Sequence, residues 1–164
     1  MPVVSSHRDE QALTLTVVSE FAASVERVWQ VWQDPRQLER WWGPPGWPAT
    51  FDRHDFTVGG QSRYHMTGPQ GEKSRGWWTI TAIEAPYRLE FDDGFADDDG
   101  EPVATDVPTH ASVTLTATGS GTRMTSVTRF VSLEQLEHVL AMGAEEGFRQ
   151  ALGQIDDLLA AAAR

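Results

Sequence analysis

The C-terminal stretch of the chain carries the pattern that most constrains the fold. Apolar residues recur there at helical spacing and form one continuous stripe: Leu136, Leu140, Ala144, Phe148, Ala151, Ile155 and Leu158. Ser132 precedes this stripe, and Gln135 follows Ser132 at the spacing of a capping box. The pattern predicts one amphipathic helix of about 30 residues, from Ser132 to Ala163, with its apolar side covered by another element.

The preceding part of the chain is typical of antiparallel strands. Residues 11 to 21 alternate with a period of two and are rich in β-branched side chains, so they predict a first strand. Between Thr50 and Phe130, pairs such as Gly59-Gly60 and Ser120-Gly121 mark hairpin turns. They delimit six further strands, at about 50–57, 61–67, 73–84, 88–92, 109–118 and 122–130. The acidic segment Asp92 to Asp106 is predicted to be a solvated loop.

Two short helices are expected between the first and second strands. Ser24 can cap a helix in which Val25, Val28, Trp29 and Trp32 share one face. Asp34-Pro35 ends that helix and begins another, which reaches Trp41-Trp42 before Gly43 breaks it. We predict a flexible tail over residues 1–10 and a single domain over residues 11–164. The fold class is α+β, a helix-grip fold in which a seven-stranded curved antiparallel sheet wraps the long C-terminal helix.

Composition excludes several classes of function. The 164 residues include no cysteine, so thiolate catalysis and cysteine-ligated metals are ruled out. The net charge of −11 opposes nucleic acid and anionic lipid. No run approaches the roughly 18 apolar residues that span a membrane, and residues 1–10 lack a signal pattern. We therefore expect no nucleic-acid partner, no membrane insertion and a cytoplasmic location.

Ordered motifs through residues 11–162 resemble a known family. They are VERVWQVWQDP and RWWGP (Val25 to Pro35, Arg40 to Pro44), VGG (Val58 to Gly60), HMTGPQG (His65 to Gly71), EAPYRLEF (Glu84 to Phe91), DGFADDDGEPV (Asp93 to Val103) and MGAEEGFRQAL (Met142 to Leu152). The order of elements resembles the SRPBCC superfamily, which includes START lipid-transfer domains and polyketide cyclases. Within it, the motifs are similar to the family of the activator of heat-shock protein 90 ATPase. The resemblance implies the helix-grip fold and a ligand crevice between the sheet and the long helix. Chaperone activation is not carried over, because the eukaryotic namesake uses an additional domain for chaperone binding.

Strand alternation selects residues for the inner face of the sheet. Tyr64 and Met66 are expected to point inward, and Ser126 and Thr128 to lie beneath the long helix. There they would meet Gly143 and Gly147, which lie on the inward stripe. Glycines at these positions allow close packing of the helix or leave room for a ligand. Both interpretations stay open.

The aromatic residues divide into core and site candidates. Trp29 and Trp32 have the spacing of a helix core. Trp42, Trp47 and Trp78 suit a binding site, because an indole offers an apolar face and one N–H donor; alternatively, Trp41 and Trp42 plug the open end of the fold. The full set of predicted ligand-binding residues is Trp42, Trp47, Phe56, Tyr64, Met66, Trp78, Phe91, Ser126, Thr128, Gly143, Gly147 and Phe148.

No catalytic or metal-binding motif is present. His54, His65 and His110 lie on predicted strands but lack the spacing of zinc ligands, so we expect no metal and no cofactor. Arg63 and Arg129 are predicted to point outward. Tyr64 could donate a hydrogen bond to a carbonyl or enolate oxygen.

Three functions are consistent with these residues. The first is binding of a small hydrophobic or aromatic molecule without catalysis. The second is an enzyme of the polyketide cyclase or hydratase type, which needs a carboxylate or histidine in the cavity. The third is a protein-interaction module related to chaperone ATPase activators, with an apolar patch near Trp41 to Trp47 and no sizeable cavity.

Overall fold

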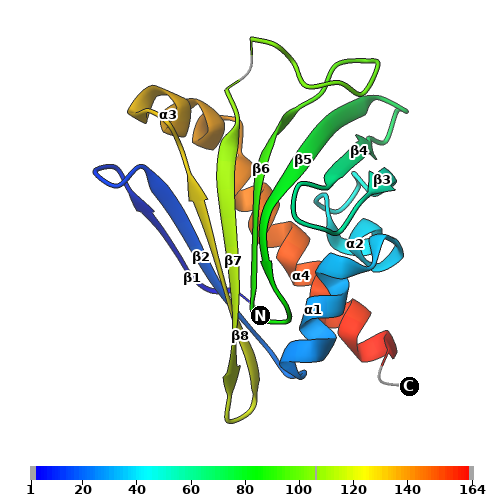
Figure 1. The fold of residues 1–164 in the computed structure, drawn as a ribbon, viewed down its shortest axis with the longest axis vertical. Coiled ribbons are helices and arrows are strands. Elements are labelled where there is room, and N and C mark those ends of the chain that lie inside the picture. Colours follow the sequence, from blue (N-terminus) through cyan, green and yellow to red (C-terminus); the bar gives the residue numbers. More distant parts are fainter. Residues whose placement is uncertain (1–2, 106, 163–164) are drawn as a thin grey trace.

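The computed structural model describes residues 3–105 and 107–162, which form one antiparallel sheet and its covering helices (Figure 1). The elements follow in the order β1 (Val3–Asp9), β2 (Thr14–Phe21), α1 (Val25–Gln33), α2 (Pro35–Trp41), β3 (Ala49–His54), β4 (Gln61–Thr67), β5 (Lys73–Glu84), β6 (Arg88–Phe95), β7 (Thr109–Thr118), β8 (Gly121–Arg129), α3 (Leu133–Ala141) and α4 (Ala144–Ala162). The sheet has eight strands in the order β1-β2-β8-β7-β6-β5-β4-β3. The α+β helix-grip architecture is confirmed.

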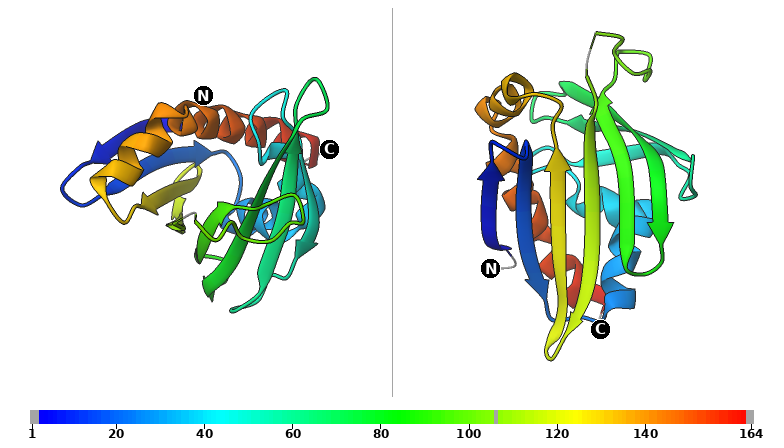
Figure 2. Two further views of the ribbon diagram at one scale, coloured as in Figure 1. Left: turned by 90° about the horizontal axis from the view of Figure 1, so that it is seen from above. Right: turned by 60° about the vertical axis from the view of Figure 1, so that its left-hand side comes forward.

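The sheet curves around α4, which crosses its concave side (Figure 2). The helix buries one stripe of apolar side chains: Ala151, Leu152, Ile155, Leu158 and Leu159. Helices α1 and α2 cover the part of the concave face that α4 leaves open (Figure 1). The hydrophobic core therefore lies between one face of the sheet and these three helices.

The short helices begin where their capping residues lie. The hydroxyl of Ser24 accepts a hydrogen bond from the backbone N–H of Arg27 at 3.2 Å, and the Asp34 carboxylate accepts one from the N–H of Arg36 at 2.9 Å. Trp29 and Trp32 on α1 are 5% and 1% exposed, so their predicted place in the core is confirmed.

The eighth strand was not predicted. Val3–Asp9 pairs antiparallel with β2, in the segment where the sequence predicted a flexible tail. That prediction is wrong for residues 3–9; residues 1 and 2 lie outside the described part of the chain. The strand escaped detection because it lies at the edge of the sheet, where both faces carry polar side chains and apolar alternation is absent.

The C-terminal helix is two helices. The prediction of one continuous helix is wrong at Gly143, whose φ of +83° is left-handed and ends α3 after the C-cap residue Met142. The capping interaction expected at Ser132 is present: its hydroxyl accepts from the N–H of Gln135 at 3.1 Å. The break lets α3 leave the line of α4 and reach over the end of the sheet (Figure 1).

None of the helices in the described residues is both long enough and apolar enough to cross a membrane.

Candidate ligand-binding site

A cavity of about 390 Å³ lies between the concave face of the sheet and the helices α3 and α4. Most of its wall is apolar and comes from strands β6, β7 and β8, which contribute Phe91, Phe95, Ala111, Val113, Val127 and the following Phe130. Val139, Met142, Ala144 and Phe148 close it from the helical side. Its size and apolar lining are typical of sites for small molecules.

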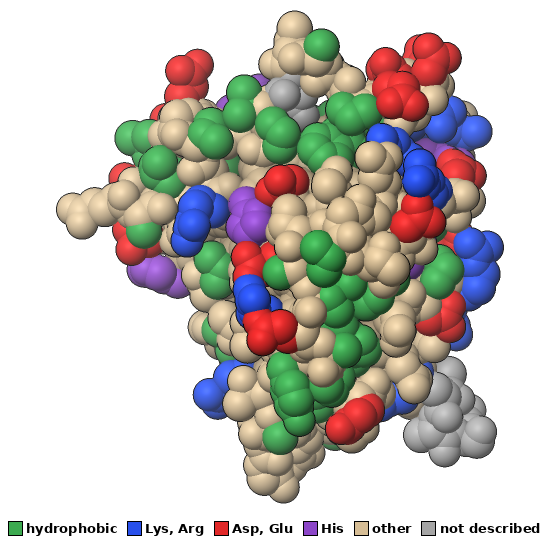
Figure 3. All heavy atoms as spheres, in the orientation of Figure 1, with side chains coloured by type: hydrophobic (Ala, Val, Ile, Leu, Met, Phe, Trp, Pro, Cys, Tyr) green, Lys and Arg blue, Asp and Glu red, His purple; other side chains and the backbone are tan. Residues whose placement is uncertain are grey.

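The cavity has a closed end and a mouth. Along β6, Phe91 is 1% exposed whereas Phe95 is 47% exposed. Along β7 and the segment before it, Val113 is 2% exposed and Val107 is 50% exposed. The exposed residues gather near α3 and the β6–β7 loop, and Figure 3 shows hydrophobic side chains along this upper edge of the molecule. A ligand would therefore enter beside α3 and move toward Val113.

An aromatic cluster forms one wall. The Trp42 ring lies between neighbours with centroid distances of 5.0 Å to Trp78, 6.0 Å to Trp32, 6.0 Å to Tyr64 and 6.4 Å to Phe148. All four contacts are edge-to-face. Trp42 is thus fixed by packing, so the cavity wall is preorganised rather than assembled by a ligand.

Two polar atoms in the wall have no partner. The hydroxyl of Ser126, on a residue that is 6% exposed, and the indole N–H of Trp42 are buried and make no hydrogen bond. Both residues line the cavity. Most buried polar groups are paired, so these two atoms are exceptions within the cavity wall.

A carboxylate lies nearer the mouth. Asp93 lines the cavity together with Thr109, whose hydroxyl donates a hydrogen bond to it. Burial raises the pKa of the Tyr64 phenol well above its usual range, and the Asp93 carboxylate adds to the increase. The indole N–H groups of Trp42 and Trp78 lower the pKa of Tyr64, although neither N–H reaches full hydrogen-bond geometry. The Tyr64 hydroxyl therefore remains protonated and able to donate a hydrogen bond.

Half of the predicted site residues line the cavity. These are Trp42, Tyr64, Phe91, Ser126, Thr128 and Phe148. For four of the six, namely Tyr64, Ser126, Thr128 and Phe148, the alternation or the helical stripe had identified the inward face. Their role in ligand binding remains a prediction.

Four other predicted side chains pack elsewhere. Trp78 is fully buried and stacks on Phe91 with a centroid distance of 4.1 Å, so it forms a layer behind the wall. Phe56 packs edge-to-face on Trp29 at 5.6 Å. The remaining two lie beside glycines of loops, Trp47 against Gly68 and Met66 close to Gly43.

Neither predicted helix glycine lines the cavity. Gly143 forms the bend between α3 and α4, and a Cβ atom there would meet no neighbour within 4 Å. A Cβ atom at Gly147 would also meet nothing within that distance. Close packing against the sheet therefore does not explain either glycine.

Other residues of the wall were missed by sequence reasoning. Asp93-Gly94 looks like a turn, and the predicted strand ended at residue 92, but β6 continues to Phe95 because β5 pairs with it up to that residue; β7 pairs with it only as far as Asp93. Alternation from Phe91 would then have placed Asp93 inward. Trp32 was assigned to the core alone, yet it also faces the cavity, and His138, which lies outside the predicted apolar stripe, lines the mouth.

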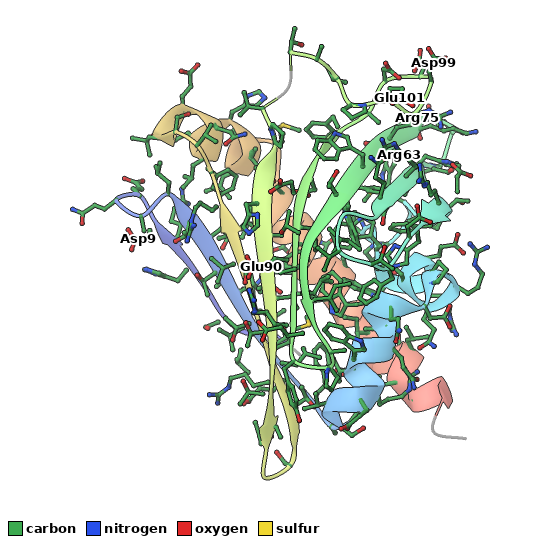
Figure 4. All side chains as sticks on the ribbon, in the orientation of Figure 1. Asp9, Arg63, Arg75, Glu90, Asp99 and Glu101 are labelled. Carbon is green, nitrogen blue, oxygen red and sulfur yellow. The ribbon has the colours of Figure 1, made fainter. Side chains whose placement is uncertain are left out.

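The histidines and charged residues outside the cavity have separate roles. His110 bridges Asp92 and Glu90 at 2.8 Å each, whereas His54 contacts Ser62 and the carbonyl of Trp32. Among the described residues, no group of three or more acidic or histidine side chains could hold a metal ion. Arg63 and Arg75 lie close to the β6–β7 loop with Asp99 and Glu101, and Arg63 reaches Glu101 at 4.0 Å (Figure 4).

The expected surface patch near Trp41 to Trp47 is not formed by Trp41. Its side chain is fully buried against Trp32, with a centroid distance of 4.7 Å, and its N–H donates to the carbonyl of Val31 at 2.9 Å. The cavity also contradicts the filled interior that the protein-interaction hypothesis required.

Comparison with known proteins identifies the family. The family model described as Activator of Hsp90 ATPase homolog 1-like protein matches residues 22–160. The chain belongs to this family. The resemblance inferred from the motifs is therefore confirmed.

Solved structures of the same shape support the assignment to this family. A protein from Arthrobacter aurescens, solved by NMR, is 57% identical with a TM-score of 0.92. The match covers 96% of this chain and 92% of the Arthrobacter aurescens chain. A crystal structure from Mycobacterium smegmatis is 48% identical with a TM-score of 0.90, covering 98% and 99%. A protein from Rhodobacter sphaeroides shares the fold at 24% identity and a TM-score of 0.83, covering 96% and 98%. No curated protein matches the chain.

Proposed function

We propose that this protein binds a small hydrophobic or aromatic molecule in the cavity beneath α3, without transforming it. The observation that carries the proposal is the cavity itself, about 390 Å³ in volume, apolar along its length and closed at one end. Burial of apolar ligand surface would contribute about 25 cal/mol per Å². The fixed aromatic wall around Trp42 reduces the cost of ordering the site when a ligand enters.

A neutral fluorescent reporter tests this proposal directly. N-phenyl-alpha-naphthylamine becomes bright in apolar surroundings, so titration with the protein should give saturable enhancement and a rise in melting temperature. Ala111→Phe places a ring in the cavity, because Ala111 lines it from β7, and should abolish the enhancement. Ala117→Phe is the matched control, since Ala117 lies on the same strand at an exposed position outside the cavity. Equal enhancement in both variants would contradict the proposal.

A catalytic alternative draws on one specific observation. Asp93 supplies a carboxylate in the cavity, and the nearby Tyr64 supplies a protonated hydroxyl. A cyclase or hydratase needs such a base and donor. Mass spectrometry of polyketide-like aromatics incubated with the protein and with Asp93→Asn separates the two functions. Conversion that Asp93→Asn loses would favour catalysis, whereas unchanged compounds with retained reporter binding would favour the binding protein.

A further inference from the structure

The closed end of the cavity contains one polar side chain with an unmet hydrogen bond. Ser126 lies on β8 between Val17 of β2 and Val113 of β7. Both neighbours are almost fully buried, and Ser126 itself is 6% exposed. Ser126 lines the cavity, and its hydroxyl is buried without a hydrogen-bond partner. A single hydroxyl in an otherwise apolar end can satisfy one oxygen of a ligand, as donor or as acceptor.

A second buried serine shows that position, not burial alone, matters. Ser19 on β2 is fully buried, and its hydroxyl also has no partner. Ser19 does not line the cavity, so no ligand atom can reach it from there. The comparison isolates the property that is special to Ser126, which is a buried, unpaired hydroxyl on a residue that lines the cavity.

The charges around the cavity restrict the ligand further. No lysine or arginine is among the described residues that line it, whereas the Asp93 carboxylate is. An anionic ligand such as a fatty acid would lose its hydration without gaining a cation and would face a like charge. A neutral oxygen meets no such penalty. The trapped polar end of the ligand is therefore an uncharged hydroxyl or carbonyl.

We propose that the cavity selects a neutral hydrophobic alcohol, phenol or ketone that enters with its oxygen first and binds it at Ser126. This inference rests on the proposed binding function and specifies its ligand class. The indole N–H of Trp42 lies in the same wall and acts on the Tyr64 hydroxyl, so Ser126 is the residue assigned to the ligand oxygen. The other side chains of the wall near Ser126 are mostly apolar and contact the hydrocarbon part of the ligand.

Three biphenyl probes of similar shape test the inference. They are para-phenylphenol, para-methylbiphenyl and biphenyl-para-carboxylate, each measured by displacement of N-phenyl-alpha-naphthylamine. Ser126→Ala should weaken para-phenylphenol about 3- to 10-fold, the value of one buried hydrogen bond. Binding of para-methylbiphenyl should stay unchanged or tighten. The carboxylate should bind most weakly to the unmodified protein.

Controls separate this inference from the proposed function. Ser19→Ala should leave all three affinities unchanged, and Ser126→Cys, which keeps the size of the side chain, should repeat the loss if Ser126→Ala does not fold. Equal effects of Ser126→Ala on the phenol and the methyl compound, or tight binding of the carboxylate, would overturn the inference while leaving the cavity a binding site. Failure of every probe to bind would instead contradict the proposed function.

Discussion

The concave face of the sheet is tightly packed in one region and hollow in another. Over β4 to β6, Trp78 and Phe91 pack against Trp32 of α1, which also contacts Trp41 of α2, and Tyr64 packs beside Trp78. Beneath α3, β7 and β8 present small side chains instead, such as Ala111 and Ser126. Only Leu136 of α3 is fully buried. The two regions show that the cavity arises from small side chains on two strands and a helix that contributes no phenyl or indole ring.

The largest contrast should appear on truncation of an aromatic side chain in each region. Trp78→Ala removes a fully buried ring that stacks on Phe91, so we expect a loss of about 3–5 kcal/mol in the free energy of unfolding. Phe148→Ala, beside the cavity and half-buried, should cost under about 2 kcal/mol. Urea denaturation of both variants measures the difference. Equal losses would mean that the two regions are packed alike.

A smaller contrast concerns buried serines. In the packed region, the Ser62 hydroxyl contacts Nδ1 of His54 at 2.7 Å, so Ser62→Ala should lower stability by about 1–2 kcal/mol, because it leaves a ring nitrogen unpaired. Ser126→Ala removes a hydroxyl without a partner and should leave stability unchanged or slightly raised. The same denaturation assay applies. A loss at Ser126 as large as that at Ser62 would show that its hydroxyl is paired in solution.

The smallest expected effect is a pH dependence of the free energy of unfolding. It comes from His54 in the packed region. Burial lowers the pKa of His54 below its ordinary value of 6.5, although the carbonyl of Trp32, which accepts from Nε2 at 3.0 Å, opposes the shift. The folded protein therefore binds fewer protons than the unfolded chain just below pH 6.5. Stability from this residue is present above that pH and is lost as the pH falls through the folded pKa.

Urea denaturation at a series of pH values measures this dependence. His54→Gln, whose amide can keep both hydrogen bonds, should flatten the curve below pH 6.5. An unchanged slope in the variant would assign the dependence to other groups.

Much of the fold could be predicted because local patterns and tertiary packing agree. Alternation and hairpin turns located β5 at residues 73–84 and β7 at 109–118, and the caps at Ser24 and Asp34 began helices as expected. At Gly143 the apolar stripe continues through the bend, so periodicity alone could not detect the break. Likewise, pairing with β5 extended β6 past an Asp-Gly pair that favours a turn.

The candidate site was less predictable for a related reason. Alternation and helical periodicity identify which side chains point inward, and they succeeded for Tyr64, Ser126 and Phe148. They do not indicate whether an inward side chain borders empty volume or another ring. Trp78 and Phe91 share one stack, yet only Phe91 reaches the cavity. That distinction depends on how layers from different elements fit together.

The open ends of the strand order have a consequence for self-association. A sheet that does not close into a barrel leaves β1 and β3 as edge strands to which a strand from another molecule can add. In β3, the backbone N–H and carbonyl of Phe51 already bond to the side chains of Glu39 and Arg36. Both edges interrupt the regular ladder with a register shift, between Val3 and Ser5 in β1 and between Phe51 and Arg53 in β3. Charged side chains stand on the same strands, Arg8 and Asp9 on one and Asp52 and Arg53 on the other. Kinked, charged edges disfavour the strand addition that leads to fibrous aggregates.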